Sequence, residues 1–191
     1  MGDIKTARLM AKRNIDILSK FDHIVTGCAS CGAALKDYKD WFSEDTSFQE
    51  KALDFSKKIS DFSEFLVNAE FRPECRLSTG LKVTYHDPCY LNLHQNICSH
   101  PRKLLNALDG IQYIEMEGAD ACCGNGSFGI THTDIGGVIQ SKKMESIKKT
   151  GADIVVTSCP GCMMNLFNGI QKNKLPVNVL HISQLIKYQA R

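Results

Sequence analysis

The sequence predicts an α/β fold with mostly parallel strands, flanking helices and an internal pseudo-repeat. Short segments rich in Val, Ile and Thr alternate with longer amphipathic stretches, as in chains whose strands are joined by helical crossovers. Two segments also read alike, DHIVTGCASC at 22–31 and DIVVTSCPGC at 153–162, with an offset of 131 residues. The alternation predicts the fold class, and the repeat predicts two related halves.

The first half of the chain predicts one strand among helices. An amphipathic helix is expected over 3–20, and the β-branched segment 23–27 should form a strand. A helix should follow the first C-x-x-C over 31–40, and apolar residues at helical spacing predict another over 48–66.

The second half predicts a longer alternation of strands and helices. Its expected strands are 82–86, 111–115, 153–157 and 177–180. Its expected helices are 101–108, 130–149, 161–173 and 181–189. Each strand is followed by a helix, which favours parallel pairing.

The offset of the repeat also predicts how the chain is organised. The segment 66–80, with Pro73 and Gly80, is the expected boundary. Residues 1–70 would form the C-terminal part of a first repeat, and residues 71–191 a complete second one. The offset places the counterparts of Cys122 and Cys123 just before Met1.

Composition excludes several classes of function. The formal net charge is +2, and no basic stripe suggests a nucleic-acid partner. No apolar run has the length of a membrane span, and the N-terminus lacks the apolar segment of a signal peptide. We therefore expect a cytoplasmic protein, which could reach the inner face of the membrane only through partners.

The chain has 9 cysteines, and their spacing is the strongest functional signal. Disulfides are rare in a reducing compartment, and an odd count argues against a closed disulfide set. Cys122 and Cys123 are adjacent, with Cys89 upstream and the C-x-x-C of Cys159 and Cys162 downstream. Adjacent thiols suit neither a disulfide nor a zinc site, whereas a polynuclear iron–sulfur cluster can bind neighbouring thiolates through different irons. The pattern predicts an unusual metal cluster.

The placement of these cysteines agrees with that chemistry. Each group follows a predicted strand, and sites in open α/β sheets gather beyond the carboxyl ends of strands. The C-x-x-C motifs also precede predicted helices, whose N-termini favour anions and lower thiol pKa values. The run from Gly124 to Gly129 matches G-x-G-x-x-G, but no predicted strand leads into it as a dinucleotide site requires. Its glycines should instead let backbone amides approach the sulfur atoms.

The set Cys89, Cys122-Cys123-Gly124 and Cys159-x-x-Cys162 resembles the cysteine-rich CCG domain. This domain occurs twice in the cysteine-rich subunit of heterodisulfide reductase and in the iron–sulfur subunits of glycolate and lactate oxidation systems. The phrases CASCGAALKDY, YHDPCYL, CCGNGSFG and TGADIVVTSCPGCMMNL look closest to the glycolate or lactate group. The resemblance covers essentially the whole chain. It implies that Cys89, Cys122, Cys123, Cys159 and Cys162 hold a noncubane [4Fe–4S] cluster.

The resemblance implies an iron–sulfur electron-transfer subunit of a flavin-linked glycolate or lactate oxidase. Such an oxidoreductase subunit would need a flavoprotein partner and the family's N-terminal ferredoxin-like part, which this sequence lacks. One alternative is a heterodisulfide or thiol–disulfide reductase in which the cluster cleaves the S–S bond. Another is a zinc-stapled structural module. Exposed clusters are labile to oxygen, so protein purified in air can be metal-free.

Other candidates remain around these five cysteines. Cys28 and Cys31 form part of a second, incomplete site, which could hold zinc or cluster iron with other ligands, or stay empty. His86 could hydrogen-bond the cluster, and His94 and His132 could support its ligands. Cys75 and Cys98 fall outside the repeat, and we expect them to be small buried apolar residues.

Overall fold

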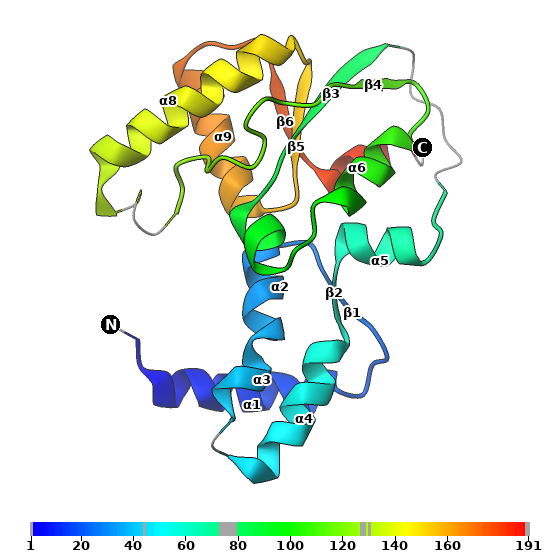
Figure 1. Ribbon diagram of the computed structural model, residues 1–191, viewed down its shortest axis with the longest axis vertical. Coiled ribbons are helices and arrows are strands. Elements are labelled where there is room, and N and C mark those ends of the chain that lie inside the picture. The colour runs from blue at the N-terminus through cyan, green and yellow to red at the C-terminus, as the bar shows by residue number, and fades with distance from the viewer. Residues whose placement is uncertain (1, 44, 73–79, 127–128, 130, 190–191) are drawn as a thin grey trace. The chain divides into compact units, whose positions relative to one another are not determined.

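The computed structural model describes residues 2–43, 45–72, 80–126, 129 and 131–189 (Figure 1). The chain forms two compact units, Met1–Phe62 and Ser63–Arg191. All strand pairs of the described residues are parallel, which confirms the predicted α/β class. The division between two CCG repeats at residue 70 remains a prediction.

The first unit packs helices around a two-stranded parallel sheet. Its elements are α1 (Ile4–Leu18), β1 (Ile24–Thr26), α2 (Ala29–Lys36), α3 (Tyr38–Trp41), α4 (Thr46–Lys57) and β2 (Ile59–Asp61). Asp3 caps α1 by accepting a hydrogen bond from the Thr6 amide at 3.0 Å. The core consists of Ala11, Ile15, Tyr38, Phe42, Ala52, Phe55 and Ile59.

Two predicted helices of this region were wrong in extent. The expected helix 31–40 is divided into α2 and α3, which meet at Asp37. The expected helix 48–66 contains β2, which lies between α4 and α5 (Phe62–Asn68). A strand of three residues is too short to show a period of its own. It forms because Ile59 and Asp61 align with Ile24 and Thr26 of β1.

The second unit is built on a four-stranded parallel sheet. Its strands are β3 (Leu81–His86), β4 (Ile111–Tyr113), β5 (Ile154–Thr157) and β6 (Asn178–His181), in the order β4-β3-β5-β6. After α5, its helical elements are the π-helical turn η1 (Tyr90–His94), α6 (Ser99–Asn106), α8 (Thr133–Thr150), α9 (Pro160–Lys172) and α10 (Ile182–Gln189). Sequence periodicity did not predict η1.

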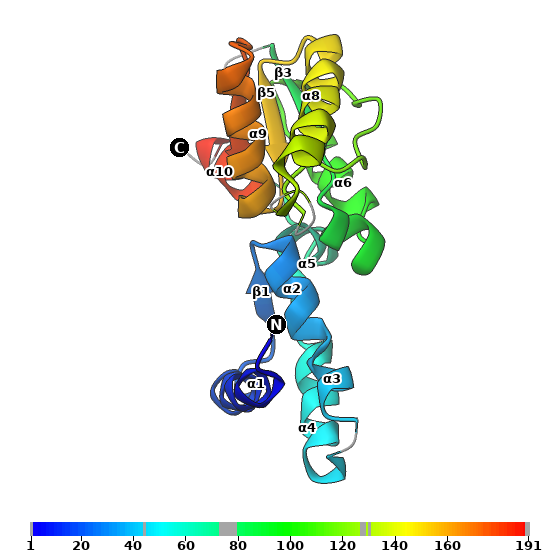
Figure 2. The same ribbon diagram turned by 90° about the vertical axis from the view of Figure 1, so that its left-hand side faces the viewer.

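Helices cover both faces of this sheet. Figures 1 and 2 show α8 and α9 on one face and α6 and α10 on the other. The four residues of β5 are buried, as expected for a central strand of a covered parallel sheet. The chain passes from β3 to β4, which pairs with one edge of β3, and then to β5, which pairs with the other edge of β3. The strand order therefore reverses at β3 and β5, where open α/β sheets bind their ligands.

The internal repeat is visible in the backbone. The order α1–β1–α2 and then β2–α5 matches the order α8–β5–α9–β6–α10. Cys28 has φ −141° and ψ 112°, and Cys159 has φ −142° and ψ 118°. The sequence repeat thus encodes the same turn from strand to helix twice.

In the described residues, no helix has the length and apolar character needed to cross a membrane.

Candidate metal centre

The candidate centre lies at the carboxyl ends of the two central strands. His86 is the last residue of β3, and it aligns with Thr157, the last residue of β5. Asp87, Pro88 and Cys89 continue from β3, and Cys89 immediately precedes η1. Cys159 lies two residues beyond β5, at the start of α9, and Cys162 lies in the first turn of that helix. Two chain segments that are far apart in sequence thus deliver cysteines to one edge.

The third segment, with Cys122 and Cys123, is fastened to α9 by two side-chain amides. Asn165 of α9 donates a hydrogen bond to the carbonyl oxygen of Cys123 at 2.6 Å. Asn125 donates to the carbonyl oxygen of Gly161 at 2.8 Å. Gln140 of α8 in turn donates to the Asn165 side-chain oxygen at 2.9 Å. These bonds hold the adjacent cysteines beside the C-x-x-C turn.

The sulfur atoms gather around Cys123. Interaction with the thiols of Cys122 and then Cys162 holds the pKa of Cys123 far below its ordinary value. The pKa of Cys122 is raised, because its thiol hydrogen-bonds to Cys123 and is partly desolvated. The pKa of Cys162 is raised because its thiol interacts with Cys123 and also with Cys159. Cys123 is therefore the sulfur atom that the other thiols of the group contact.

The pKa values of these thiols follow their contacts with one another. Cys162 lies in the first turn of α9, where a helix N-terminus favours the thiolate, yet its pKa is raised by its contacts with Cys123 and Cys159. The charge of the group is set by contacts between its sulfur atoms.

His86 completes the buried group. One ring nitrogen lies with the sulfur atoms of Cys123 and Cys162 in a set whose members are all within 4.8 Å of one another. The side chain is 0% exposed, and neither of its ring nitrogens has a conventional hydrogen-bond partner in the described residues. Buried polar atoms are normally satisfied. The contact of His86 with Cys123 helps to lower the pKa of that thiol, so the imidazole and the two sulfur atoms together form one ligand set.

The structure places the other three predicted ligands, Cys28, Cys31 and Cys89, in different surroundings. Cys89 is half-buried, three residues beyond His86, and within the described residues its sulfur makes no hydrogen bond to the other four. Cys28 and Cys31 lie in the first unit, one half-buried and the other exposed. The Cys28 sulfur lies 3.3 Å from the Ser30 hydroxyl. The geometry thus brings together four of the seven predicted cysteines.

Glycines allow the cysteine loop to approach α8. A Cβ atom on Gly124 would lie 2.6 Å from the carbonyl oxygen of Gly136, and one on Gly136 would lie 2.7 Å from that of Gly129. Gly124 also has φ +93°, which favours glycine. Its amide donates to the sulfur of Cys122 at 3.3 Å. The glycines serve close packing of the loop on α8, in addition to the sulfur contact that the sequence predicted.

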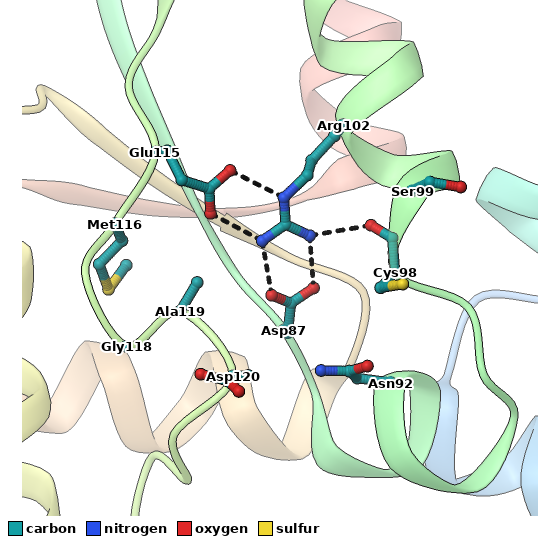
Figure 3. A pocket seen from close by; sticks show the side chains of 10 residues that line it. All are labelled: Asp87, Asn92, Cys98, Ser99, Arg102, Glu115, Met116, Gly118, Ala119 and Asp120. Carbon is teal, nitrogen blue, oxygen red and sulfur yellow. Dashed lines mark hydrogen bonds and ion pairs between the residues drawn. The ribbon is translucent and has the colours of Figure 1, made fainter.

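Arg102 of α6 fixes the start of the Cys89 loop (Figure 3). Its guanidinium donates to both carboxylate oxygens of Asp87, at 2.9 and 2.7 Å, and to Glu115 at 2.8 and 2.7 Å. The Asp87 side chain is only 3% exposed. Hydrogen bonds to Asp87 and then Glu115 raise the pKa of Arg102 above its ordinary value, so the ion pair persists. The network borders an open cavity of about 450 Å³.

Four further candidates from the sequence were His94, His132, Cys98 and Cys75. His94 packs its ring against Tyr90 at 5.8 Å, and His132 contacts the Thr131 hydroxyl at 3.0 Å. Cys98 is exposed and borders the cavity beside Arg102, so its predicted burial was wrong. It precedes α6, whose apolar side faces the sheet through Leu104 and Leu105 instead. Cys75 lies outside the described residues.

Several residues that shape the centre were missed in the sequence. No sequence motif marks the side chains that hold the loops of the centre, which belong to Arg102, Gln140, Lys143 and Asn165. One signal was available for Lys143, which occupies the buried stripe of α8 together with Gly136 and Ile147. A lysine at an apolar position of a helical pattern marks a charge with a buried role.

These features define a cysteine-rich metal-binding domain, and the comparisons agree. The family model described as "Cysteine-rich domain", CCG, matches residues 1–36 and 83–167. The chain belongs to this family.

Among its relatives, a probable glycolate oxidase iron-sulfur subunit of Bacillus subtilis is 34% identical over 97% of this chain and 43% of that protein. Lactate utilization protein A of Lysinibacillus sphaericus is 30% identical over 97% of this chain and 82% of that protein. A subunit of the fumarate reductase (CoM/CoB) of Methanothermobacter marburgensis is 33% identical over 97% of this chain and 36% of that protein. The chain therefore spans less than half of the first and third of these relatives.

The residues present fit an iron–sulfur cluster. Thiolates are soft ligands that suit iron–sulfur clusters and zinc. Four cysteines already lie together, and Cys89 follows the same strand as His86. His86, Cys123 and Cys162 are buried, and their donor atoms lie within 4.8 Å of one another, as the ligands of a metal centre must.

The glycine packing can be tested with two neighbouring substitutions in α8. Gly136→Ala should lower the free energy of unfolding by about 1–3 kcal/mol, because its Cβ would strike the Gly129 carbonyl. Gly137→Ala is the control, since a Cβ there meets nothing within 4 Å and should stabilise the helix by up to about 1 kcal/mol. Urea unfolding of both variants measures the difference. Equal effects would contradict the packing role.

The Arg102 network predicts a large cost when its cation is removed. Arg102→Met should destabilise the protein by about 3 kcal/mol, because the Asp87 carboxylate would stay buried without a partner. Lys103→Met, at an exposed position of the same helix, should change stability by less than about 0.5 kcal/mol. Thermal unfolding compares the two. Similar melting temperatures for both variants would show that the network is dispensable.

His86 should contribute to metal binding directly. In cluster-free protein under anaerobic conditions, Co²⁺ should bind near Cys123 and Cys162 and give thiolate-to-metal absorption. His86→Ala should weaken this binding at least about tenfold, since one member of the ligand set is removed. His94→Ala, which alters an exposed ring on η1, is the control. Unchanged Co²⁺ affinity in His86→Ala would exclude the imidazole from the site.

Proposed function

We propose that the chain is an electron-transfer subunit with a noncubane [4Fe–4S] cluster. Its ligands would be Cys89, Cys122, Cys123, Cys159 and Cys162. The observation that supports this most is the gathering of Cys122, Cys159 and Cys162 around the buried thiolate of Cys123. Membership of the cysteine-rich family and the name of the Bacillus subtilis iron-sulfur relative add support. When bound, the cluster supplies one-electron redox chemistry.

The reaction that we assign to the complex is the oxidation of a 2-hydroxy acid, glycolate or lactate. The acid would lose two electrons and two protons to a flavin on a partner protein and become a 2-oxo acid. The electrons would then leave the reduced flavin one at a time through this chain to a quinone or another acceptor. The names of the glycolate and lactate relatives support this class of substrate.

The partners follow from the same proposal. The chain would bind the flavoprotein and the ferredoxin-like part found in longer family members, and it would contact a membrane only through them. A cytoplasmic site of action would keep the cysteine ligands reduced, because structural disulfides are rare in reducing compartments.

A second candidate is reduction of a disulfide, in which the same cysteines hold a cluster that cleaves the S–S bond. The fumarate reductase (CoM/CoB) relative supports thiol–disulfide chemistry in general, since its name includes two thiols, CoM and CoB, whose oxidation to a disulfide is the reverse of this reaction. Turnover of a disulfide substrate by the cluster-loaded chain, with release of two thiols for two electrons, would support it over electron transfer alone.

Anaerobic reconstitution tests the cluster itself. The wild-type chain should take up about four irons and four sulfides and give an EPR signal in one of its redox states. Cys123→Ser should abolish most of this uptake, because it removes the central thiolate. Cys98→Ser is the matched control, since Cys98 is exposed and lies outside the group.

Two results would contradict the proposal. Wild-type protein that never binds more than trace iron would exclude the cluster. Stoichiometric zinc, retained during anaerobic preparation without charge-transfer absorption, would favour a structural module instead. Loss of zinc on Cys28→Ser together with Cys31→Ser would place that metal in the first unit.

A further inference from the structure

Lys143 is a buried cation beside the cysteine loop. It lies on the inner side of α8 and is only 2% exposed. Its ammonium donates hydrogen bonds to the carbonyl oxygens of Gly118, at 2.6 Å, and Ala119, at 3.2 Å. These two residues lie four and three positions before Cys122, respectively. A long, rotamer-rich side chain is thus held in one place next to the centre.

The Ala119 carbonyl joins two of the cysteine-bearing loops. It accepts the hydrogen bond from Lys143 and a second one, at 3.0 Å, from the amide of Asp87. Asp87 begins the loop of Cys89, and Ala119 begins the loop of Cys122 and Cys123. Lys143 therefore binds at the junction where the two loops meet.

Among the described residues, no carboxylate contacts the Lys143 ammonium directly. Arg102 occupies both oxygens of Asp87, and within the part of the chain that the structure describes no carboxylate forms an ion pair with Lys143. Burial lowers the pKa of Lys143, and the negative charge of Cys123 opposes this more than Asp120, Asp87 or Cys122 does. A buried ammonium is costly unless an anion lies near it. The Ala119 carbonyl that it binds lies three residues before Cys122 and accepts a hydrogen bond from the amide of Asp87, two residues before Cys89, so the ammonium lies where the loops of three predicted ligands meet.

We propose that Lys143 is the counter-charge of the metal centre: it fixes the junction of the two cysteine loops and stabilises the more negative, reduced state of the cluster. This inference rests on the cluster assigned under the proposed function. One-electron reduction adds one negative charge to the centre, and the Lys143 ammonium lies at the junction of the loops that carry its ligands. The fixed positive charge therefore favours the reduced state and raises the reduction potential.

A purely structural lysine would act differently. If Lys143 only tied the Gly118 and Ala119 carbonyls together, its removal would loosen the loop and leave the potential of an assembled cluster unchanged. The electrostatic role requires the charge, and Arg can supply that charge at the same position. The potential and the effect of Arg therefore separate the two roles.

The test compares reconstituted Lys143→Met, Lys143→Gln and Lys143→Arg with wild type in EPR-monitored redox titrations. At a fixed potential, Lys143→Met and Lys143→Gln should hold about tenfold less reduced cluster, which corresponds to a midpoint about 59 mV lower. Lys143→Arg should recover most of this difference. Lys142→Met, at the adjacent exposed position, should match wild type. Equal midpoints in wild type and Lys143→Met would overturn the electrostatic role.

Hydrogen exchange of the cluster-free chain tests the positioning role separately. In Lys143→Met, the amide of Asp87 and the segment 119–124 should exchange at least about tenfold faster than in wild type, while Lys142→Met should not change them. Unchanged protection would overturn the positioning role. This measurement is independent of iron. A wild-type chain that binds no iron would therefore refute the proposed function and the electrostatic role, while the exchange data still decide the positioning role.

Discussion

The structure depends on the burial of a group of thiols around one sulfur atom. Cys123 is only 2% exposed, and its pKa lies far below its ordinary value. Negative charge at a buried sulfur is costly without partners, so its surroundings must compensate. Cys122 and Cys162 interact with it through their thiols, His86 lies within reach, and Lys143 provides a nearby cation. The strand ends, the glycine packing and the Asn165 contact hold these partners in place.

The two copies of the repeat show how much the neighbouring strand matters. Val156 of β5 is 0% exposed, because β5 lies between β3 and β6. Its counterpart Val25 is 41% exposed, since β1 pairs only with β2 among the described residues. The cysteines differ in the same way, with Cys159 buried and Cys28 half-buried. The same local sequence forms the same turn twice, but the buried centre also needs the segments that follow β3 and β4.

The fold class could be predicted because its signals are local: β-branched runs identified the strands of the second unit. Cysteine spacing pointed to Cys122, Cys123, Cys159 and Cys162, whose thiols the fold brings together. The strand β2 was not predicted, because three residues are too few to show a period. The roles of Arg102 and Lys143 were not predicted for another reason: they depend on Asp87 and on carbonyl groups that the sheet brings near. Backbone acceptors carry no sequence signal, so a side chain that binds them can be assigned only from the fold.

Side chains from helices on both faces of the sheet link the stability of the fold to assembly of the centre. Arg102 reaches Asp87 from α6, and Lys143 reaches Ala119 from α8 on the opposite face (Figure 1). The amide of Asp87 and the carbonyl of Ala119 bond to each other, so both helices act on one junction. Moving either loop would separate the buried Asp87 carboxylate from Arg102, or the Lys143 ammonium from its carbonyl partners. Ligand binding at the cysteines therefore draws on contacts that also hold the sheet and its helices together, and the free energy of metal binding adds directly to that of folding.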